Sequence, residues 1–327
     1  MGLDLLKHGG RRSTVAREES SDMILRDQIL QEFIERYSGS PAFIVRAPGR
    51  VNLIGEHTDY NDGFVLPIAI DRSVWIAARP REDRKISCYS TVYGEWLSFS
   101  LDELHREEHT WGEYLKGIAW VLQNEGFDLS GWEGIVTGDI PIGAGLSSSA
   151  AFEMAALRTF SEISGFAWDA KRMAKLGRGS EMMWVGVESG IMDQMISALK
   201  REGHALLIDC RSLETEAISI PDGVAMVVLD TGTRRDLVLS AYNLRQADGR
   251  EAVGFSGVGS LSDLSMDALE EFASEVDPIL YQRARHVVSE NMRTLQAVEA
   301  LRLGELGLLG ELMNASHKSL RDDYGVS

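Results

Sequence analysis

The sequence predicts an α+β protein organised in two lobes. Short runs rich in β-branched and aromatic residues alternate with stretches of helical period along most of the chain. With 327 residues, of which 44% are hydrophobic, the chain is long enough to bury a large core. The composition turns polar at Arg201-Glu202-Gly203, between two apolar runs, and we place the boundary between the lobes there. We therefore expect a leader at 1–22, an N-terminal lobe at 23–203 and a C-terminal lobe at 204–327.

The elements follow from local pattern. Residues 1–22 are mixed in charge and have no apolar period, which predicts a disordered leader. From Met23 to Tyr37 apolar residues recur at three- and four-residue steps, and this spacing predicts an amphipathic helix. Strands are expected next at 43–45, 64–70, 74–78, 86–91 and 96–101. The pattern then predicts a helix at 111–124, a strand at 134–139, helices at 147–164, 169–184 and 192–200, strands at 204–209, 216–220 and 224–230, and mainly helix after Thr233.

Charge and cysteine content exclude several classes of protein. Thirty-three Lys and Arg stand against 50 Asp and Glu, a formal charge of −17, which disfavours binding to nucleic acid or to a membrane surface. Two cysteines, Cys88 and Cys210, cannot build a disulfide framework. No signal peptide or membrane-spanning run is present. We therefore expect a cytoplasmic protein, and an anionic ligand would need a locally positive site.

A glycine- and serine-rich segment, residues 139–151, offers such a site. Gly143 and Gly145 permit tight turns, and three serines precede an Ala-rich helix. The N-terminus of a helix presents N–H groups and the positive end of its dipole, so it can bind phosphate. The segment matches neither a Walker A loop nor a GxGxxG dinucleotide loop. Taken alone, it is equally compatible with an ordinary Ser-rich helix start.

Two further segments concentrate polar groups. In residues 47–63, Arg50, Glu56, His57 and Asp59 alternate with apolar residues, a mixture of donors and acceptors that suits the recognition of several hydroxyls. A polar turn after a buried strand is one alternative. A metal site using His57 and Asp59 is another, although one His without regular ligand spacing favours it little. In residues 181–194, Asp193 stands among apolar residues and is either a functional carboxylate or a helix cap.

Together these segments closely resemble the galactokinase branch of the GHMP small-molecule kinases. Residues 48–60 (PGRVNLIGEHTDY) resemble the sugar signature of galactokinases, and residues 141–151 resemble the GHMP phosphate loop. Further matches lie at 190–194, at Tyr242-Asn243 with Arg245, and at 315–324. The resemblance implies the two-lobed GHMP kinase fold with the active site in the cleft between the lobes. It also implies transfer of the γ-phosphoryl group of ATP to the C1 hydroxyl of α-D-galactose, the first committed step of galactose catabolism.

The resemblance also implies roles for individual residues. Asp193 and Arg50 match the catalytic positions, where Asp193 would accept or orient the proton of the C1 hydroxyl and Arg50 would keep Asp193 ionised and offset phosphoryl charge. The galactose-binding positions are matched by Glu56, His57, Asp59, Gly190, Asp193 and Tyr242. The ATP phosphates would lie on Gly143, Gly145, Ser147, Ser148 and Ser149. Ser149 and Glu181 match the positions that hold Mg²⁺, the expected cofactor.

Some expectations depend on departures from the family pattern. Family members usually continue into a third, glycine-rich motif, whereas this chain stops at Ser327 without it, so we expect the C-terminal lobe to be incomplete at its end. One alternative is a catalytically silent sensor of galactose and ATP, and another is an N-acetylgalactosamine kinase. A truncated product without a function of its own is a third. The expected partners are galactose and ATP, and the expected assembly is a monomer, with a weak homodimer as the alternative.

Overall fold

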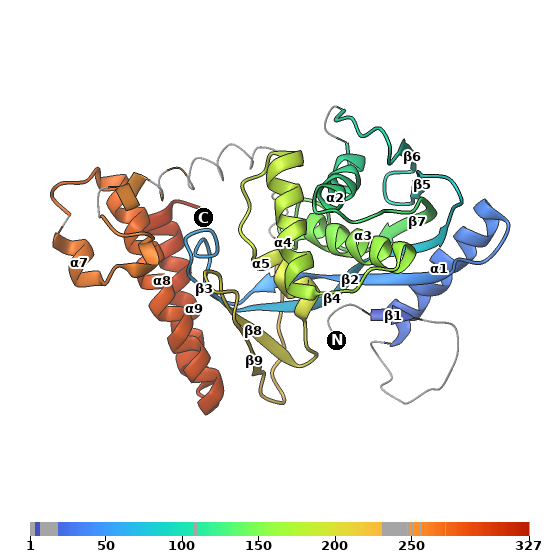
Figure 1. The fold of residues 1–327 in the computed structure, drawn as a ribbon. Helices are drawn as coiled ribbons and strands as arrows, with labels where there is room; N and C mark the ends of the chain where they lie inside the picture. Colours follow the sequence, from blue (N-terminus) through green and yellow to red (C-terminus); the bar gives the residue numbers. More distant parts are fainter. Residues whose placement is uncertain are drawn as a thin grey trace. The chain divides into compact units, whose positions relative to one another are not determined.

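The computed structural model describes residues 4–6, 19–107, 110–230, 247, 249, 251–254, 257–271 and 273–326. The chain divides into two compact units, each built from separate stretches of sequence. Unit 1 contains Met1–Gly49, Ile70–Gly186 and Asp193–Leu199, and unit 2 contains Arg50–Ala69, Val187–Met192 and Lys200–Ser327. Helices and strands both occur in each unit, which agrees with the predicted α+β class (Figure 1).

Unit 1 is organised around a mixed six-stranded sheet in the order β1-β2-β4-β7-β5-β6. β7 runs antiparallel to β4 and parallel to β5, and β5 forms an antiparallel pair with β6. The strands are β1 (Asp4–Leu6), β2 (Phe43–Asn52), β4 (Pro67–Pro80), β5 (Lys85–Ser90), β6 (Glu95–Ser100) and β7 (Trp132–Gly138).

The helices of unit 1 bury apolar faces. Ile29 and Phe33 of α1 (Glu19–Tyr37) pack against Trp75, Ala77 and Ile135 of the sheet. The remaining helices are α2 (Gly112–Asn124), α3 (Ser148–Ser164), α4 (Ala170–Ser180) and α5 (Met192–Leu199). Figure 1 shows α2, α3 and α4 gathered beside one another. A π-helical turn, Glu181–Val185, continues α4 directly.

Unit 2 combines a small sheet with long helices. Its antiparallel sheet has the order β3-β8-β9, with β3 at Phe64–Val65, β8 at His204–Asp209 and β9 at Thr215–Ser219. The helical part includes a 3-10 turn at Leu261–Asp263, α7 (Met266–Glu271), α8 (Pro278–Leu303), α9 (Leu306–Ser319) and a π-helical turn at Leu320–Tyr324. Asp277 caps α8 by accepting from the N–H groups of Ile279 and Leu280. α8 and α9 run side by side (Figure 1).

The expected boundary between the lobes at residue 203 differs from the observed division, because two short segments that precede this residue in sequence belong to unit 2. Residues 50–69 belong to unit 2, although they precede most of unit 1 in sequence. Leu53, Ile54 and Leu66 pack into one core with residues of α8 and α9, and β3 pairs with β8. Tertiary packing of apolar side chains, and not proximity along the chain, therefore assigns this segment to its unit.

Three local predictions were wrong. Residues 4–6 of the expected disordered leader form β1 on the open edge of β2, whose unpaired N–H and C=O groups accept a short strand. Helix α1 begins at Glu19 and not at Met23. The segment 224–230 forms no strand, and Val227 and Leu229 are 77% and 84% exposed. Strand propensity needs a neighbouring edge to pair with, and within the described residues no strand pairs with this segment.

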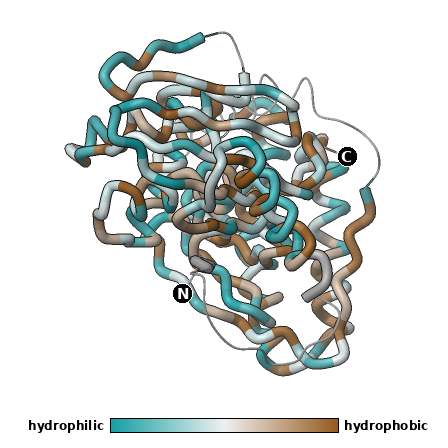
Figure 2. The backbone as a smooth tube through the Cα atoms, turned by 90° about the vertical axis from the view of Figure 1, so that its right-hand side faces the viewer, coloured by the Kyte–Doolittle hydropathy of each residue, from teal (hydrophilic) through white to brown (hydrophobic). Residues whose placement is uncertain are grey.

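Hydrophobic segments alternate with hydrophilic ones along the backbone (Figure 2), as expected where each element buries one face. In the described part of the chain, every helix is too short or too polar to cross a lipid bilayer.

Candidate active site

The predicted phosphate loop connects β7 to α3 in unit 1. Its backbone is left-handed at Gly143, Gly145 and Ser147, with φ values of 72°, 76° and 62°. Ser147 is the N-cap of α3, but its side chain makes no capping hydrogen bond, and no acidic residue stands in the first turn. The N-terminus of α3 thus keeps the positive character that suits a phosphate group. Ser148 and Ser149 form the start of the same turn, half-buried.

The hydroxyl of Ser147 contacts a side chain of another helix instead of capping α3. It donates a hydrogen bond to Oδ2 of Asp193, which lies in the first turn of α5. A left-handed backbone at a serine is unfavourable, so this orientation is maintained by the surrounding fold. The contact joins a predicted ATP-binding residue to the predicted catalytic carboxylate. Asp193 thus accepts from a side chain outside its own helix, and its catalytic role stays a prediction.

The predicted metal-binding pair is also brought together. Ser149 Oγ donates to Oε1 of Glu181 at 3.4 Å. Glu181 begins the π-helical turn after α4, and such turns occur frequently at functional sites. Its other oxygen accepts from Nε2 of Gln194 at 3.1 Å, which fixes the carboxylate. Among the described residues, no three His, Cys, Asp or Glu side chains converge as a ready metal cage.

Two residues of this cluster, Glu153 and Gln194, were not predicted from the sequence. The amide of Gln194 donates at 2.9 Å to Oε2 of Glu153, a fully buried carboxyl group on α3. Burial, and then the charges of Glu181 and Asp193, raise the pKa of Glu153 well above its usual value. An acidic residue between Phe152 and Met154 in an Ala-rich helix is the same signal that singled out Asp193.

The predicted sugar-binding segment follows β2 in unit 2 and forms a turn at residues 55–63. Gly55 and His57 have left-handed backbone, with φ of 99° and 65°. Thr58 Oγ1 binds the carbonyl oxygens of Gly55 and Phe64 at 2.8 and 2.7 Å, and Asn61 Nδ2 donates to the carbonyl of His57 at 2.8 Å. Side-chain hydrogen bonds therefore hold the turn, as expected for residues that favour turn conformations.

Two predicted galactose-binding residues meet directly. A Cβ atom at Gly190 would lie 1.7 Å from Oδ2 of Asp59, so only glycine fits beside this carboxylate. His57 is held differently: its Nδ1 lies 2.7 Å from the hydroxyl of Tyr60, and its ring stacks on that of Tyr324 with centroids 4.6 Å apart. The hydroxyls of Tyr60 and Tyr324 lie 2.8 Å apart. Tyr324 was missed as a contributor to the site, although its motif was noted in the sequence.

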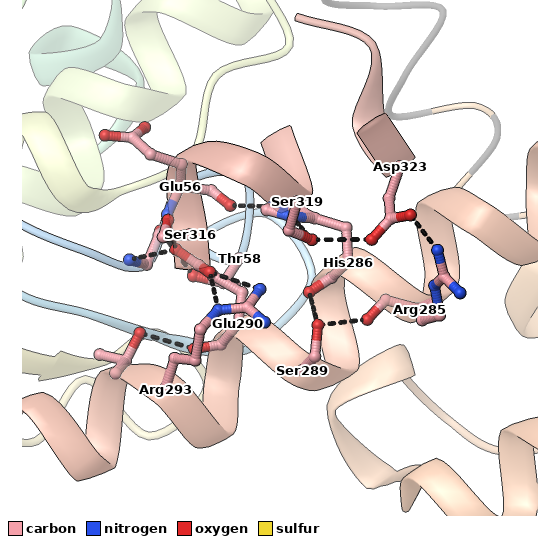
Figure 3. A network of polar contacts seen from close by, with 12 residues as sticks. Glu56, Thr58, Arg285, His286, Ser289, Glu290, Arg293, Ser316, Ser319 and Asp323 are labelled. Carbon is pink, nitrogen blue, oxygen red and sulfur yellow. Dashed lines mark hydrogen bonds and ion pairs between the residues drawn. The ribbon is translucent and has the colours of Figure 1, made fainter. Parts of the chain in front are cut away.

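The remaining predicted residues divide between the units. Arg50 lies in β2 and belongs to unit 2, whereas Asp193 belongs to unit 1, and their pairing stays a prediction. Glu56 lies in the turn of unit 2, and its carboxylate points away from the contacts of its own backbone (Figure 3). Tyr242 lies outside the described residues.

Comparison with known proteins identifies both segments. A model described as the galactokinase galactose-binding signature matches residues 31–80, and a model of the GHMP kinase N-terminal domain matches residues 113–201. The galactokinase of Roseiflexus sp. is 46% identical over 310 residues, which cover 93% of this chain and 79% of that protein. The galactokinase of Chloroflexus aggregans is 47% identical over 300 residues, covering 90% and 77%.

Solved structures of kinases are also similar to this chain. The crystal structure of Lactococcus lactis galactokinase in complex with galactose superposes with a TM-score of 0.85 at 34% identity and covers 93% of this chain and 81% of that one. Methanococcus jannaschii mevalonate kinase, at 17% identity and a TM-score of 0.52 over 86% of this chain and 79% of its own, shares the fold. With the phosphate loop and the sugar signature both matched, the chain belongs to the galactokinase family of the GHMP kinases.

Proposed function

We propose that this protein is a galactokinase, which transfers the γ-phosphoryl group of ATP to the C1 hydroxyl of α-D-galactose and so begins galactose catabolism. The observation that carries the proposal is the hydrogen bond from Ser147 to Asp193. It joins the phosphate-binding end of α3 to a carboxylate that can accept a proton, and a phosphoryl acceptor must meet both groups at once. The galactokinases at 46% and 47% identity support the same reaction.

In the proposed reaction, the oxygen of the C1 hydroxyl forms a bond to the γ-phosphorus. The bond between that phosphorus and the β–γ bridging oxygen breaks, and ADP leaves. Asp193 orients the hydroxyl and receives its proton, and Arg50 offsets the charge that develops on the phosphoryl group. Gly143, Gly145, Ser147, Ser148 and Ser149 would bind the phosphates of ATP through backbone N–H groups and hydroxyls.

Galactose would be recognised by Glu56, His57, Asp59, Gly190, Asp193 and Tyr242. A site built from buried donors and acceptors discriminates against sugars that leave one of these groups unpaired. The turn that carries Glu56, His57 and Asp59 is held by hydrogen bonds from Thr58 and Asn61, which would present its side chains in a fixed arrangement.

The residues present suit Mg²⁺ as the cofactor. One hydroxyl, from Ser149, and one carboxylate, from Glu181, lie within 3.4 Å of each other and supply the hard oxygen donors that this ion prefers. Mg²⁺ takes its other ligands from water and phosphate, so a cage of several acidic residues is unnecessary. When bound, the ion would neutralise charge on the phosphates of ATP.

A cytoplasmic location belongs to the same proposal. Both cysteines are buried and neither forms a disulfide bond, as is usual where thiols stay reduced. The substrate phosphate donor, ATP, is an intracellular metabolite for enzymes of this class. Fractionation of the native host, followed by an activity assay on each fraction, tests the location.

The experiment that tests the function is release of ADP by the purified chain with Mg-ATP. Galactose, glucose, N-acetylgalactosamine and mevalonate are compared at equal concentration. We expect turnover with galactose and at least about tenfold less with the other three, since each leaves at least one polar group of the site misplaced. Turnover with N-acetylgalactosamine equal to that with galactose would contradict the proposed specificity. Calorimetric binding of galactose without any ADP release would indicate a sensor.

A further inference from the structure

The peptide groups around Glu56 are held by side chains of α8. This residue sits between Gly55 and His57, two of the left-handed positions of the turn. The carboxylate of Glu290 accepts from the N–H of Gly55 at 3.0 Å and lies 3.4 Å from the N–H of Glu56. The carbonyl oxygen of Glu56 lies 2.9 Å from Nε2 of His286. The peptide groups on both sides of Glu56 are thus fixed from one helix (Figure 3).

His286 is completely buried, and its two ring nitrogens have distinct partners. A carbonyl oxygen only accepts, so Nε2 must carry the proton that it shares with Glu56. Nδ1 lies 2.9 Å from the hydroxyl of Ser319, which in turn lies 3.0 Å from Oδ2 of Asp323. The ring is therefore fixed at both ends, by the turn on one side and by the end of α9 on the other.

The Glu290 side chain is as fully buried as that of His286, and both of its carboxylate oxygens have partners. Its second oxygen pairs with the guanidinium of Arg293 at 2.7 Å, which offsets the buried negative charge. The hydroxyl of Ser316 also donates to the oxygen that faces the turn. Figure 3 shows these side chains converging on the backbone of the turn, whereas the carboxylate of Glu56 points the opposite way.

A second path leads from His286 to the same turn. Its ring lies against that of Tyr324, with centroids 4.7 Å apart, and Tyr324 stacks on His57. His286 therefore contacts the peptide of one predicted sugar-binding residue directly and the side chain of another through a single ring. A group placed in this way can set the orientation of both without touching the sugar.

We propose that His286 is a positioning residue for galactose: its Nε2–H holds the Glu56 carbonyl and thereby aims the side chains of Glu56 and His57 at the sugar. This inference rests on the proposed function. Loss of the bond would let the peptide group between Glu56 and His57 rotate, and the sugar would then have to reorder it on binding. The consequence is weaker galactose binding, with little change at the ATP site.

Two variants of His286 separate positioning from general stability. The amide of a glutamine reaches the place of Nε2, so His286→Gln retains a donor for the Glu56 carbonyl. The amide of an asparagine reaches the place of Nδ1, so His286→Asn retains the contact with Ser319 and loses the donor. We expect His286→Asn to raise the KM for galactose about tenfold, with kcat and the KM for ATP within about twofold of wild type. His286→Gln should stay within about threefold of wild type for all three constants.

His317→Asn, the same change at an exposed position of α9, is the matched control and should change nothing. If His286→Asn does not fold, Ser319→Ala removes the other hydrogen-bond partner of the ring and should raise the KM for galactose about threefold without affecting that for ATP. Equal KM values for the Gln and Asn variants, or a fall in kcat alone, would overturn the inference.

Calorimetric titration with galactose alone distinguishes the two failures. Wild-type protein that binds no galactose would overturn the proposed function and the inference with it. Wild-type protein that binds galactose and releases ADP, together with an Asn variant that binds it equally tightly, would overturn the inference only.

Discussion

Gly190 and Asp59 lie so close that a methyl group on Gly190 would come within 1.7 Å of Oδ2 of Asp59. No rotation of a neighbouring side chain other than Asp59 itself can relieve this overlap, because all three of the nearest atoms belong to its carboxyl group. Both residues match galactose-binding positions, so the space beside Gly190 determines where the Asp59 carboxylate points.

We predict that Gly190→Ala displaces the Asp59 carboxylate and raises the KM for galactose by on the order of 100-fold, as expected for a misplacement of about 1 Å. The melting temperature should fall by only a few degrees, because Asp59 is half-buried and can move. Steady-state kinetics measure the first effect and thermal unfolding the second.

Gly310→Ala is the control for this substitution. Gly310 lies in α9 with open space around its Cα, so the added methyl group should leave the kinetics unchanged and favour the helix by up to about 1 kcal/mol. Wild-type kinetics in Gly190→Ala would show that the position of Asp59 does not matter for sugar binding.

Asp193 should be required for turnover and not for folding. Asp193→Asn keeps an acceptor for the Ser147 hydroxyl but cannot take a proton, so we predict a fall in kcat of about 10²–10⁴-fold. The Asp193→Asn variant should still bind galactose, as measured by calorimetry. The exposed Asp222→Asn variant serves as the control. Turnover within twofold of wild type for Asp193→Asn would exclude this residue as the catalytic carboxylate.

The Mg²⁺ requirement should depend on Glu181. Glu181→Gln removes the negative charge from the predicted metal ligand, so it should raise the Mg²⁺ concentration for half-maximal activity at least about tenfold. The measurement is a Mg²⁺ titration at fixed ATP. Glu202→Gln, at an exposed position, should titrate like wild type. An unchanged Mg²⁺ dependence in Glu181→Gln would remove Glu181 from the metal site.

Glu153 should make stability depend on pH. Burial raises the pKa of this group in the folded protein, so the native state keeps a proton that the unfolded chain loses above its ordinary pKa. Stability therefore falls as pH rises through the window between the unfolded and the folded pKa. Glu153→Gln, which mimics the protonated form and still accepts from Gln194, should remove this dependence.

The test compares melting temperatures at pH 5 and pH 8. Relative to wild type, Glu153→Gln should gain more stability at pH 8 than at pH 5, whereas Glu311→Gln, at an exposed position of α9, should follow wild type at both. A difference of the opposite sign would mean that Glu153 is ionised in the folded protein.

Most helices were predictable because their signals are local. The apolar period of α1 and the Ala-rich composition of α3 each act within a few residues. The strand at 224–230 was predicted wrongly because strand formation depends on more than local signals. Its β-branched residues favour a strand only where the edge of another strand is available for pairing. In the region where a helix was expected at 169–184, the α-helix ends at Ser180 and a π-helical turn follows. The spacing of apolar residues does not predict this change of helix type.

By itself, the sequence determined the family. The sugar signature at 48–60 and the phosphate loop at 141–151 are contiguous motifs, so their residue types and spacing identify a family without reference to the fold. Tertiary structure alone decided which residues support them. His286 lies 230 residues from Glu56, Asp193 lies 46 from Ser147, and residues 50–69 join the unit of α8. Contacts across such distances arise from the packing of apolar faces, which many segments of the chain could satisfy, and local pattern therefore cannot select among them.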